Sequence, residues 1–124
     1  MQDANGRLLA LARRVAAMYT AGEKARASAV LGSVARRESD AFSDIDLGIY
    51  YDTMPTEEEV TAGREALNAT HLVRLPGGSD EAIADIFTVD GVECQVIHCT
   101  AARIEADLGA VLDTHRRHFE VWHP

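Results

Sequence analysis

Apolar residues recur along the chain with two different periods, which predict helices in some segments and strands in others. From Gly6 to Ala21 they recur every three or four positions, as expected of an amphipathic helix. From Asp44 to Tyr51 they alternate with other residues, which predicts a strand with one apolar face and one face that carries two carboxylates. Between these segments we expect a short strand over Arg26 to Leu31 and a short helix from Ser33 to about Glu38.

The second half of the chain predicts a further helix and strand. Thr56 and Glu59 match a capping box, in which each side chain bonds the other residue's backbone, so a helix is expected to begin there and to end near Ala69. A strand is expected over His71 to Leu75. Thr100 can cap a last helix, whereas the segment from His115 to Pro124 has no clear period.

A β-hairpin is predicted between these last segments. Two β-rich runs, Ala84 to Val89 and Val92 to His98, are separated by Asp90-Gly91, a dipeptide that suits a two-residue type I′ turn. If the residues that flank this turn pair with each other, Glu93 and Gln95 lie on one face of the second run. The other face, which contains Cys94, has the apolar character of a core.

Length and composition narrow the classes of protein that fit. The 124 residues support one domain over 1–124, in which 115–124 is either a tail or the start of a further C-terminal region. A net charge of −8 disfavours the phosphate attraction that drives non-specific nucleic-acid binding. The apolar stretches are short and the first residues lack a leader pattern, so we expect no membrane span and a cytoplasmic protein.

The feature that carries chemistry is Gly32-Ser33 at a strand-to-helix turn, followed by ten residues and then Asp44-Ile45-Asp46. A glycine before a helix N-terminus lets backbone N–H groups approach a phosphate, and Ser33 adds a hydroxyl donor. Asp44 and Asp46 face the same side of a strand and can share a divalent cation that also binds phosphate oxygens. Separately, the turn can be a simple helix cap and the aspartates a solvated face; together they predict a site for a nucleoside triphosphate with Mg²⁺.

Such a site supports phosphoryl or nucleotidyl transfer, in which metal ions stabilise the attacking and leaving oxygens of an in-line displacement. Protein side chains then mainly position the ions and the phosphates. Arg36 and Arg37 follow the glycine-serine turn closely, and they are either phosphate ligands or part of a solvated helix end.

These residues resemble the signature of the polymerase beta-like nucleotidyltransferase superfamily. The string LGSVARRESDAFSDIDLGIY is similar to its minimal and antibiotic nucleotidyltransferase branches. The resemblance implies an α/β (α+β) fold with a mixed β-sheet flanked by helices, and transfer of a nucleoside monophosphate from a triphosphate to a hydroxyl. Residue by residue, it places the triphosphate on Gly32 and Ser33 and catalysis with Mg²⁺ on Asp44 and Asp46, with Ser43 supporting the first aspartate.

The chain departs from this family at the third carboxylate, which usually lies on a later strand beside the aspartate strand. Gln95 occupies the aligned position, and a neutral amide binds Mg²⁺ less well than a carboxylate and cannot act as a base. Glu93, on the same face of that strand, is either a substitute metal ligand or an exposed edge glutamate. Nucleotide binding is therefore better supported than turnover.

Two functions fit these observations. The first is a small Mg²⁺-dependent nucleotidyltransferase, with ATP as the expected donor, that modifies a hydroxyl of a protein side chain or of a small molecule such as an antibiotic. Because 124 residues leave no room for an acceptor-binding domain, a helical partner protein or a second copy would complete the site. The second is a catalytically weak nucleotide-binding or partner-binding module, such as an antitoxin or a regulatory subunit.

Overall fold

The computed structural model describes residues 4–31, 44–103 and 120–122. Within them lie two helices with assigned bounds, α1 (Ala4–Thr20) and α3 (Glu57–Ala66). The strands are β1 (Ala25–Leu31), β2 (Ile45–Tyr51), β3 (Thr70–Arg74), β4 (Ala82–Val89), β5 (Val92–Thr100) and β6 (Glu120–Trp122). The helix expected after residue 33 lies outside the described residues.

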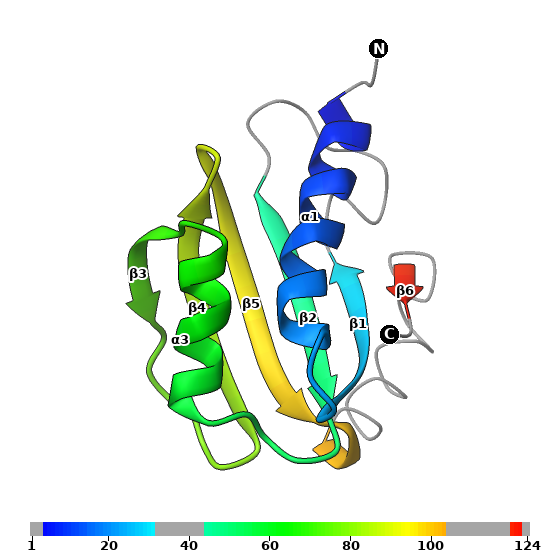
Figure 1. The fold of residues 1–124 in the computed structure, drawn as a ribbon, viewed down its shortest axis with the longest axis vertical. Helices are drawn as coiled ribbons and strands as arrows, with labels where there is room; N and C mark the ends of the chain where they lie inside the picture. The colour runs from blue at the N-terminus through cyan, green and yellow to red at the C-terminus, as the bar shows by residue number, and fades with distance from the viewer. Residues whose placement is uncertain (1–3, 32–43, 104–119, 123–124) are drawn as a thin grey trace.

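The strands form one six-stranded sheet in the order β3-β4-β5-β2-β1-β6 (Figure 1). β2 and β5 run parallel, and the other described neighbours run antiparallel. Helix α1 packs against β1 and β2, and α3 lies beside it on the same face of the sheet (Figure 1). This mixed sheet flanked by helices confirms the predicted fold class.

The hydrophobic core lies between the two helices and the sheet. The alternation in β2 places Ile45, Leu47 and Ile49 on the helix-covered face, where each is fully buried. Burying a side chain of this size contributes about 1.5–3 kcal/mol to folding, so exposing this face of β2 to solvent would greatly destabilise the fold. The even-numbered residues of β2 are therefore held on the opposite face, as the sequence predicts.

Two local predictions are confirmed, one by hydrogen bonds and the other by backbone dihedral angles. The N–H of Glu59 donates to Thr56 Oγ1 at 3.2 Å and the N–H of Thr56 donates to Glu59 Oε1 at 2.8 Å, which completes the capping box of α3. At the hairpin turn, Asp90 and Gly91 have φ values of 53° and 80°. Both positive values are required by a type I′ turn, and they set the pairing of β4 with β5 that the sequence predicts.

The structure differs from the prediction at the end of α3 and in a strand that was not expected. Helix α3 ends at Ala66 rather than near Ala69, because Asn68 adopts a left-handed conformation with φ of 55° that stops the helix. Strand β6 was not predicted; it pairs antiparallel with β1, placing Trp122 opposite Ser28. A strand of three residues is too short to display an alternating pattern.

The start of the last predicted helix lies within the described residues. Residues 101–103 are helical, and Thr100 Oγ1 accepts a hydrogen bond from the N–H of Arg103 at 3.2 Å. This bond confirms Thr100 as a cap, whereas the rest of that predicted helix lies outside the described residues. Neither helix with assigned bounds has the length and apolar composition needed to span a membrane.

Candidate functional site

The two aspartates lie at the start of β2, on the face of the sheet that is opposite to α1 and α3. Asp44 directly precedes the strand and is exposed, and Asp46 is half-buried. Their common direction follows from the burial of Ile45 and Leu47 on the other face. The core therefore aims both carboxylates to one side, as the sequence predicts.

The parallel pairing of β2 with β5 determines what lies beside the aspartates. Asp46 is paired with Gln95, and Ile45 is paired with Cys94. Asp44 and Glu93 each lie one residue before that second pair, so they are neighbours at the same end of the two strands. The structure thus brings Asp44, Asp46 and Glu93 together, with the neutral Gln95 next to Asp46.

The charge of Asp44 contributes to raised pKa values at Asp46 and Glu93. The pKa of Asp46 is raised by burial and, to a smaller extent, by the charge of Asp44. The pKa of Glu93 is raised first by the charge of Asp44, then by a side-chain hydrogen bond with Asp44, with smaller effects of burial and of Asp46. Each of these charges would be stabilised by a cation placed between them.

The donor set at this end of the sheet fits a hard divalent cation. Carboxylate oxygens from Asp44, Asp46 and Glu93 are the ligands that Mg²⁺ prefers, and Gln95 adds a weaker amide oxygen. Within the described ranges, however, no group of three or more His, Cys, Asp and Glu residues already has an arrangement that could hold a metal ion. The carboxylates are therefore neighbours that would have to converge around an ion.

The predicted triphosphate-binding residues lie outside the described residues. These are Gly32, Ser33, Arg36 and Ser43. The described chain stops at Leu31, the last residue of β1, and resumes at Asp44. Leu31 is paired with Asp46 of β2.

A further polar residue on the acidic face was not singled out from the sequence. Asp46, Gly48 and Tyr50 occupy alternate positions of β2, so Tyr50 lies on the same side of the strand as Asp46. Tyr50 is 5 % exposed. A Cβ atom built on Gly48 would lie 2.4 Å from the hydroxyl oxygen of Tyr50. The phenol therefore occupies the space that a side chain at position 48 would fill.

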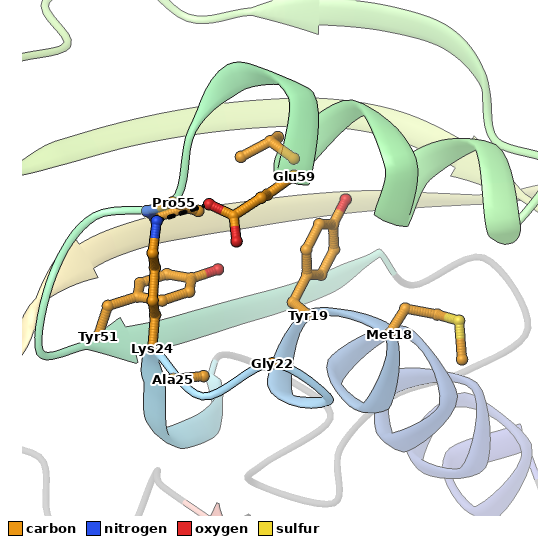
Figure 2. A pocket seen from close by; sticks show the side chains of 9 residues that line it. Met18, Tyr19, Gly22, Lys24, Ala25, Tyr51, Pro55 and Glu59 are labelled. Atoms are coloured by element: carbon orange, nitrogen blue, oxygen red, sulfur yellow. Dashed lines mark hydrogen bonds and ion pairs between the residues drawn. The ribbon is translucent and has the colours of Figure 1, made fainter.

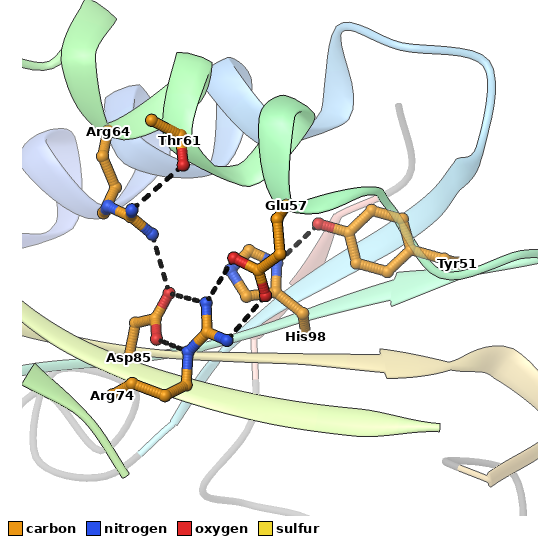
Figure 3. A network of polar contacts seen from close by, with 7 residues as sticks. All are labelled: Tyr51, Glu57, Thr61, Arg64, Arg74, Asp85 and His98. Carbon is orange, nitrogen blue, oxygen red and sulfur yellow. Dashed lines mark hydrogen bonds and ion pairs between the residues drawn. The ribbon is translucent and has the colours of Figure 1, made fainter. Parts of the chain in front are cut away.

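The helix-covered face contains a different polar cluster, centred on the fully buried Asp85 of β4 (Figure 3). Arg64 Nη1 of α3 donates to Asp85 Oδ2 at 3.1 Å, and Arg74 of β3 bonds both carboxylate oxygens of Asp85. Arg74 also donates to both carboxylate oxygens of Glu57, at 2.7 and 3.2 Å, and this bonding lowers the pKa of Glu57. The cluster connects α3 to β3 and β4. Both carboxylate oxygens of Asp85 accept hydrogen bonds from arginines, so Asp85 is not a candidate metal ligand.

Next to this cluster lies the fully buried His98 of β5. Its Nδ1 atom is 2.6 Å from the hydroxyl oxygen of Tyr51, and its ring contacts the edge of Tyr19 with ring centres 4.7 Å apart. Burial lowers the pKa of His98 to about 4, so the imidazole is neutral at physiological pH. Among the described side chains, Tyr19 Oη and His98 Nε2 are the buried polar atoms without a hydrogen-bond partner.

A small cavity of about 90 Å³ lies on this helix-covered side, between the end of α1 and the start of α3 (Figure 2). Tyr19 and Tyr51 line it, and Lys24 Nζ contacts Glu59 Oε1 at 2.7 Å beside it. The acidic residues lie on the other face and at the start of β2, whereas Tyr51 is the last residue of that strand. The cavity is therefore not part of the acidic site.

No protein-family model and no curated protein matches this chain. Thirty-two chains among the solved structures match it, and one of them is a chain of the Cid1 poly(U) polymerase. That likeness has a TM-score of 0.54 at 12 % sequence identity and covers 88 % of this chain but 34 % of the polymerase chain. The chain thus spans about a third of the polymerase chain, and the likeness confirms the fold that the resemblance implied.

Proposed function

We propose that this domain is a Mg²⁺-dependent nucleotidyltransferase that moves a nucleoside monophosphate from a nucleoside triphosphate, with ATP as the expected donor, onto a hydroxyl. The observation that carries the proposal is the parallel register of β2 with β5, which makes Asp44, Asp46 and Glu93 neighbours on one face. The fold likeness to a poly(U) polymerase supports the same class of reaction.

In the proposed reaction, the oxygen of the acceptor hydroxyl attacks the α-phosphorus of the triphosphate. The bond from that phosphorus to the bridging oxygen breaks, pyrophosphate leaves with the electron pair, and the hydroxyl proton passes to a carboxylate or to water. Bound Mg²⁺ would stabilise the charge on the phosphate oxygens. Asp44, Asp46 and Glu93 would hold it, while Gly32, Ser33 and Arg36 bind phosphates and Ser43 supports Asp44.

The acceptor in this proposal is a protein side chain or a small molecule such as an antibiotic. The domain provides one wall of the site, and a helical partner protein or a second copy of the chain provides the other. If the acceptor is a side chain of the partner protein, one partner provides both the acceptor hydroxyl and the second wall. This arrangement needs fewer components than a separate acceptor and a second copy of the chain.

The second candidate is a nucleotide-binding or partner-binding module with weak catalysis, such as an antitoxin or a regulatory subunit. The observation that favours it is the pairing of Gln95 with Asp46, which leaves a neutral amide where a further carboxylate would complete the metal site. Replacing Gln95→Asp separates the candidates. An enzyme weakened at this position gains transfer activity, whereas a binding module shows no transfer and an unchanged affinity for its partner.

The decisive experiment is calorimetric titration with ATP and GTP, with and without Mg²⁺. We expect magnesium-dependent binding to the wild type that is lost in an Asp44→Asn/Asp46→Asn double variant. The matched control is Asp52→Asn, because Asp52 follows the other end of β2 and its side chain forms an exposed ion pair with Arg26 at 3.4 Å. The absence of nucleotide binding to the wild type, or equal loss in the control, would refute the proposal.

A further inference from the structure

Tyr50 and Gly48 together form a feature of the acidic face that the proposed reaction does not yet use. Asp46, Gly48 and Tyr50 follow one another at every second position of β2, so their side-chain directions are the same. Tyr50 packs with Ala29 of β1 and Cys99 of β5, and these small neighbours leave room for its ring. The phenol is therefore held against the sheet.

The contact between Tyr50 and Gly48 shows which way the ring points. A Cβ atom at Gly48 would lie 2.4 Å from Tyr50 Oη, 2.8 Å from Cζ and 3.0 Å from Cε1, so the outer end of the ring covers this glycine. Because Gly48 lies between Tyr50 and Asp46 in the strand, the ring is folded back toward Asp46. The hydroxyl consequently lies over the middle of the strand, on the side of Tyr50 that faces Asp46.

Gly48 is required by this contact and not by its own backbone conformation. The glycines with positive φ among the described residues are Gly77 and Gly91, so alanine would fit the strand backbone at position 48. What alanine would meet is the phenol, because the oxygen and the Cζ atom of Tyr50 would lie less than 3.0 Å from the new Cβ, so the side chain of Tyr50 would have to move. The glycine thus serves to seat the tyrosine hydroxyl.

The hydroxyl lies at the row of Gly48, which is the next row of this strand face beyond Asp46. Residues two apart on one strand face are separated by about 7 Å, so Tyr50 Oη, which lies over position 48, is about this far from the Cβ of Asp46. In a nucleoside triphosphate, the sugar is the group attached directly to the α-phosphate. A sugar that extends along β2 from phosphates held at the carboxylates would reach this hydroxyl first.

We propose that Tyr50 binds the sugar of the nucleotide through a hydrogen bond from its hydroxyl, and that Gly48 makes this position available. The inference rests on the proposed function, because Asp44 and Asp46 must hold the phosphates for the sugar to lie there. A phenol both donates and accepts hydrogen bonds, as sugar hydroxyls do. Burial raises the pKa of Tyr50 to about 12, so the donor proton is retained at neutral pH.

The test compares Tyr50→Phe with the wild type by calorimetry in Mg²⁺, using ATP, 2′,3′-dideoxy-ATP and inorganic tripolyphosphate. Loss of one hydrogen bond should weaken ATP binding about tenfold. Tripolyphosphate has no sugar, so its affinity should be the same for both proteins. The dideoxy nucleotide lacks the sugar hydroxyls, so the difference between the two proteins should disappear with it as well.

Two further variants keep the test interpretable. Gly48→Ala displaces the ring and should also weaken ATP binding without weakening tripolyphosphate binding. Tyr51→Phe changes the neighbouring tyrosine, whose hydroxyl contacts His98 on the other face, and should leave both affinities unchanged. Thermal unfolding of each variant shows that the protein used in the titration is folded.

The outcomes separate this inference from the proposed function. If the wild type binds ATP through Asp44 and Asp46 but Tyr50→Phe binds ATP equally well, Tyr50 does not contact the sugar and only this inference fails. Equal weakening for ATP and tripolyphosphate would assign Tyr50 a purely structural role and would also overturn it. Failure of the wild type to bind either ligand would overturn the proposed function and this inference together.

Discussion

On the helix-covered face of the sheet, the buried carboxylate of Asp85 is bonded by the guanidinium groups of Arg64 and Arg74. On the opposite face, the charged groups that shift the pKa values of Asp46 and Glu93 are other carboxylates. The first arrangement balances its charge within the chain and holds elements together. Among the described residues, the second has an excess of negative charge that a cation from solution would balance, which distinguishes a structural cluster from a candidate binding site.

The largest expected effect comes from breaking the balanced cluster. Asp85→Asn removes the charge that the two arginines share and should lower the free energy of unfolding by about 3–5 kcal/mol, the usual cost of removing one partner of a buried ion pair. Urea denaturation measures the change. Glu57→Gln, at the exposed end of the same cluster, should cost less than about 1 kcal/mol. A similar small loss for both variants would show that burial of Asp85 does not determine its contribution.

The two faces should also respond oppositely to pH. The pKa of His98 in the folded protein is about 4, below its ordinary value of 6.5, so the unfolded chain takes up a proton first as the pH falls. Stability is therefore unaffected by His98 above about pH 6.5, and about 3 kcal/mol is lost as the pH decreases to 4. Raised pKa values at Asp46 and Glu93 act in the opposite direction, because protonation on acidification removes the partly buried charge of Asp46 and relieves the repulsion of Glu93 by Asp44.

The contribution of His98 can be isolated by comparing pH-dependent unfolding of the wild type and His98→Gln, whose amide can still bond Tyr51. The variant should show a weaker loss of stability between pH 6.5 and 4 than the wild type. His71→Gln is the control, since His71 lies exposed on the edge strand β3. Identical slopes for the wild type and His98→Gln would contradict the buried neutral state of this histidine.

A smaller effect distinguishes two tyrosines that lie against the same histidine. Tyr51→Phe removes the 2.6 Å contact with His98 Nδ1 and should cost about 1–2 kcal/mol, because both partners are buried. Tyr19→Phe removes a buried hydroxyl that has no hydrogen-bond partner among the described residues, so it should be neutral or should stabilise the fold by up to about 1 kcal/mol. Thermal unfolding monitored by circular dichroism measures both. Equal destabilisation would mean that the Tyr19 hydroxyl contributes a bond in solution.

The smallest expected change in stability comes from the acidic face. Glu93→Gln removes one of the repelling carboxylates, so without Mg²⁺ the melting temperature should rise slightly. The same variant should bind Mg²⁺ with ATP more weakly if Glu93 is a ligand. Calorimetry and thermal unfolding on one preparation measure the two effects. Unchanged affinity would identify Glu93 as an exposed edge glutamate, the alternative reading of this position.

Features set by neighbouring residues could be predicted from the sequence. The capping box of Thr56 and Glu59, the Asp90-Gly91 turn and the alternation of β2 each depend on residues a few positions apart. The turn also determines the pairing of β4 with β5, so the faces of Glu93 and Gln95 were predicted correctly. These local rules account for most element positions and for the common face of Asp44 and Asp46.

Features that depend on distant pairing could not be predicted in the same way. The register of β2 against β5 is set by no turn, so the sequence left open whether Glu93 lies near the aspartates. The bonds from Arg64 and Arg74 to Asp85 join three separate elements and leave no periodic signal. The fold-back of Tyr50 over Gly48 is a choice of side-chain conformation, which alternation along a strand does not reveal.

The parallel junction of β2 with β5 also has a consequence for the order of folding. The hairpin of β4 and β5 closes through a two-residue turn, whereas Asp46 and Gln95 come from distant parts of the chain. Closing so long a loop has a larger entropic cost, so contacts of this kind form late and slow the folding rate. The acidic site is therefore assembled only when the two halves of the sheet join, and a partly folded chain would contain the hairpin but not the neighbouring carboxylates of β2 and β5.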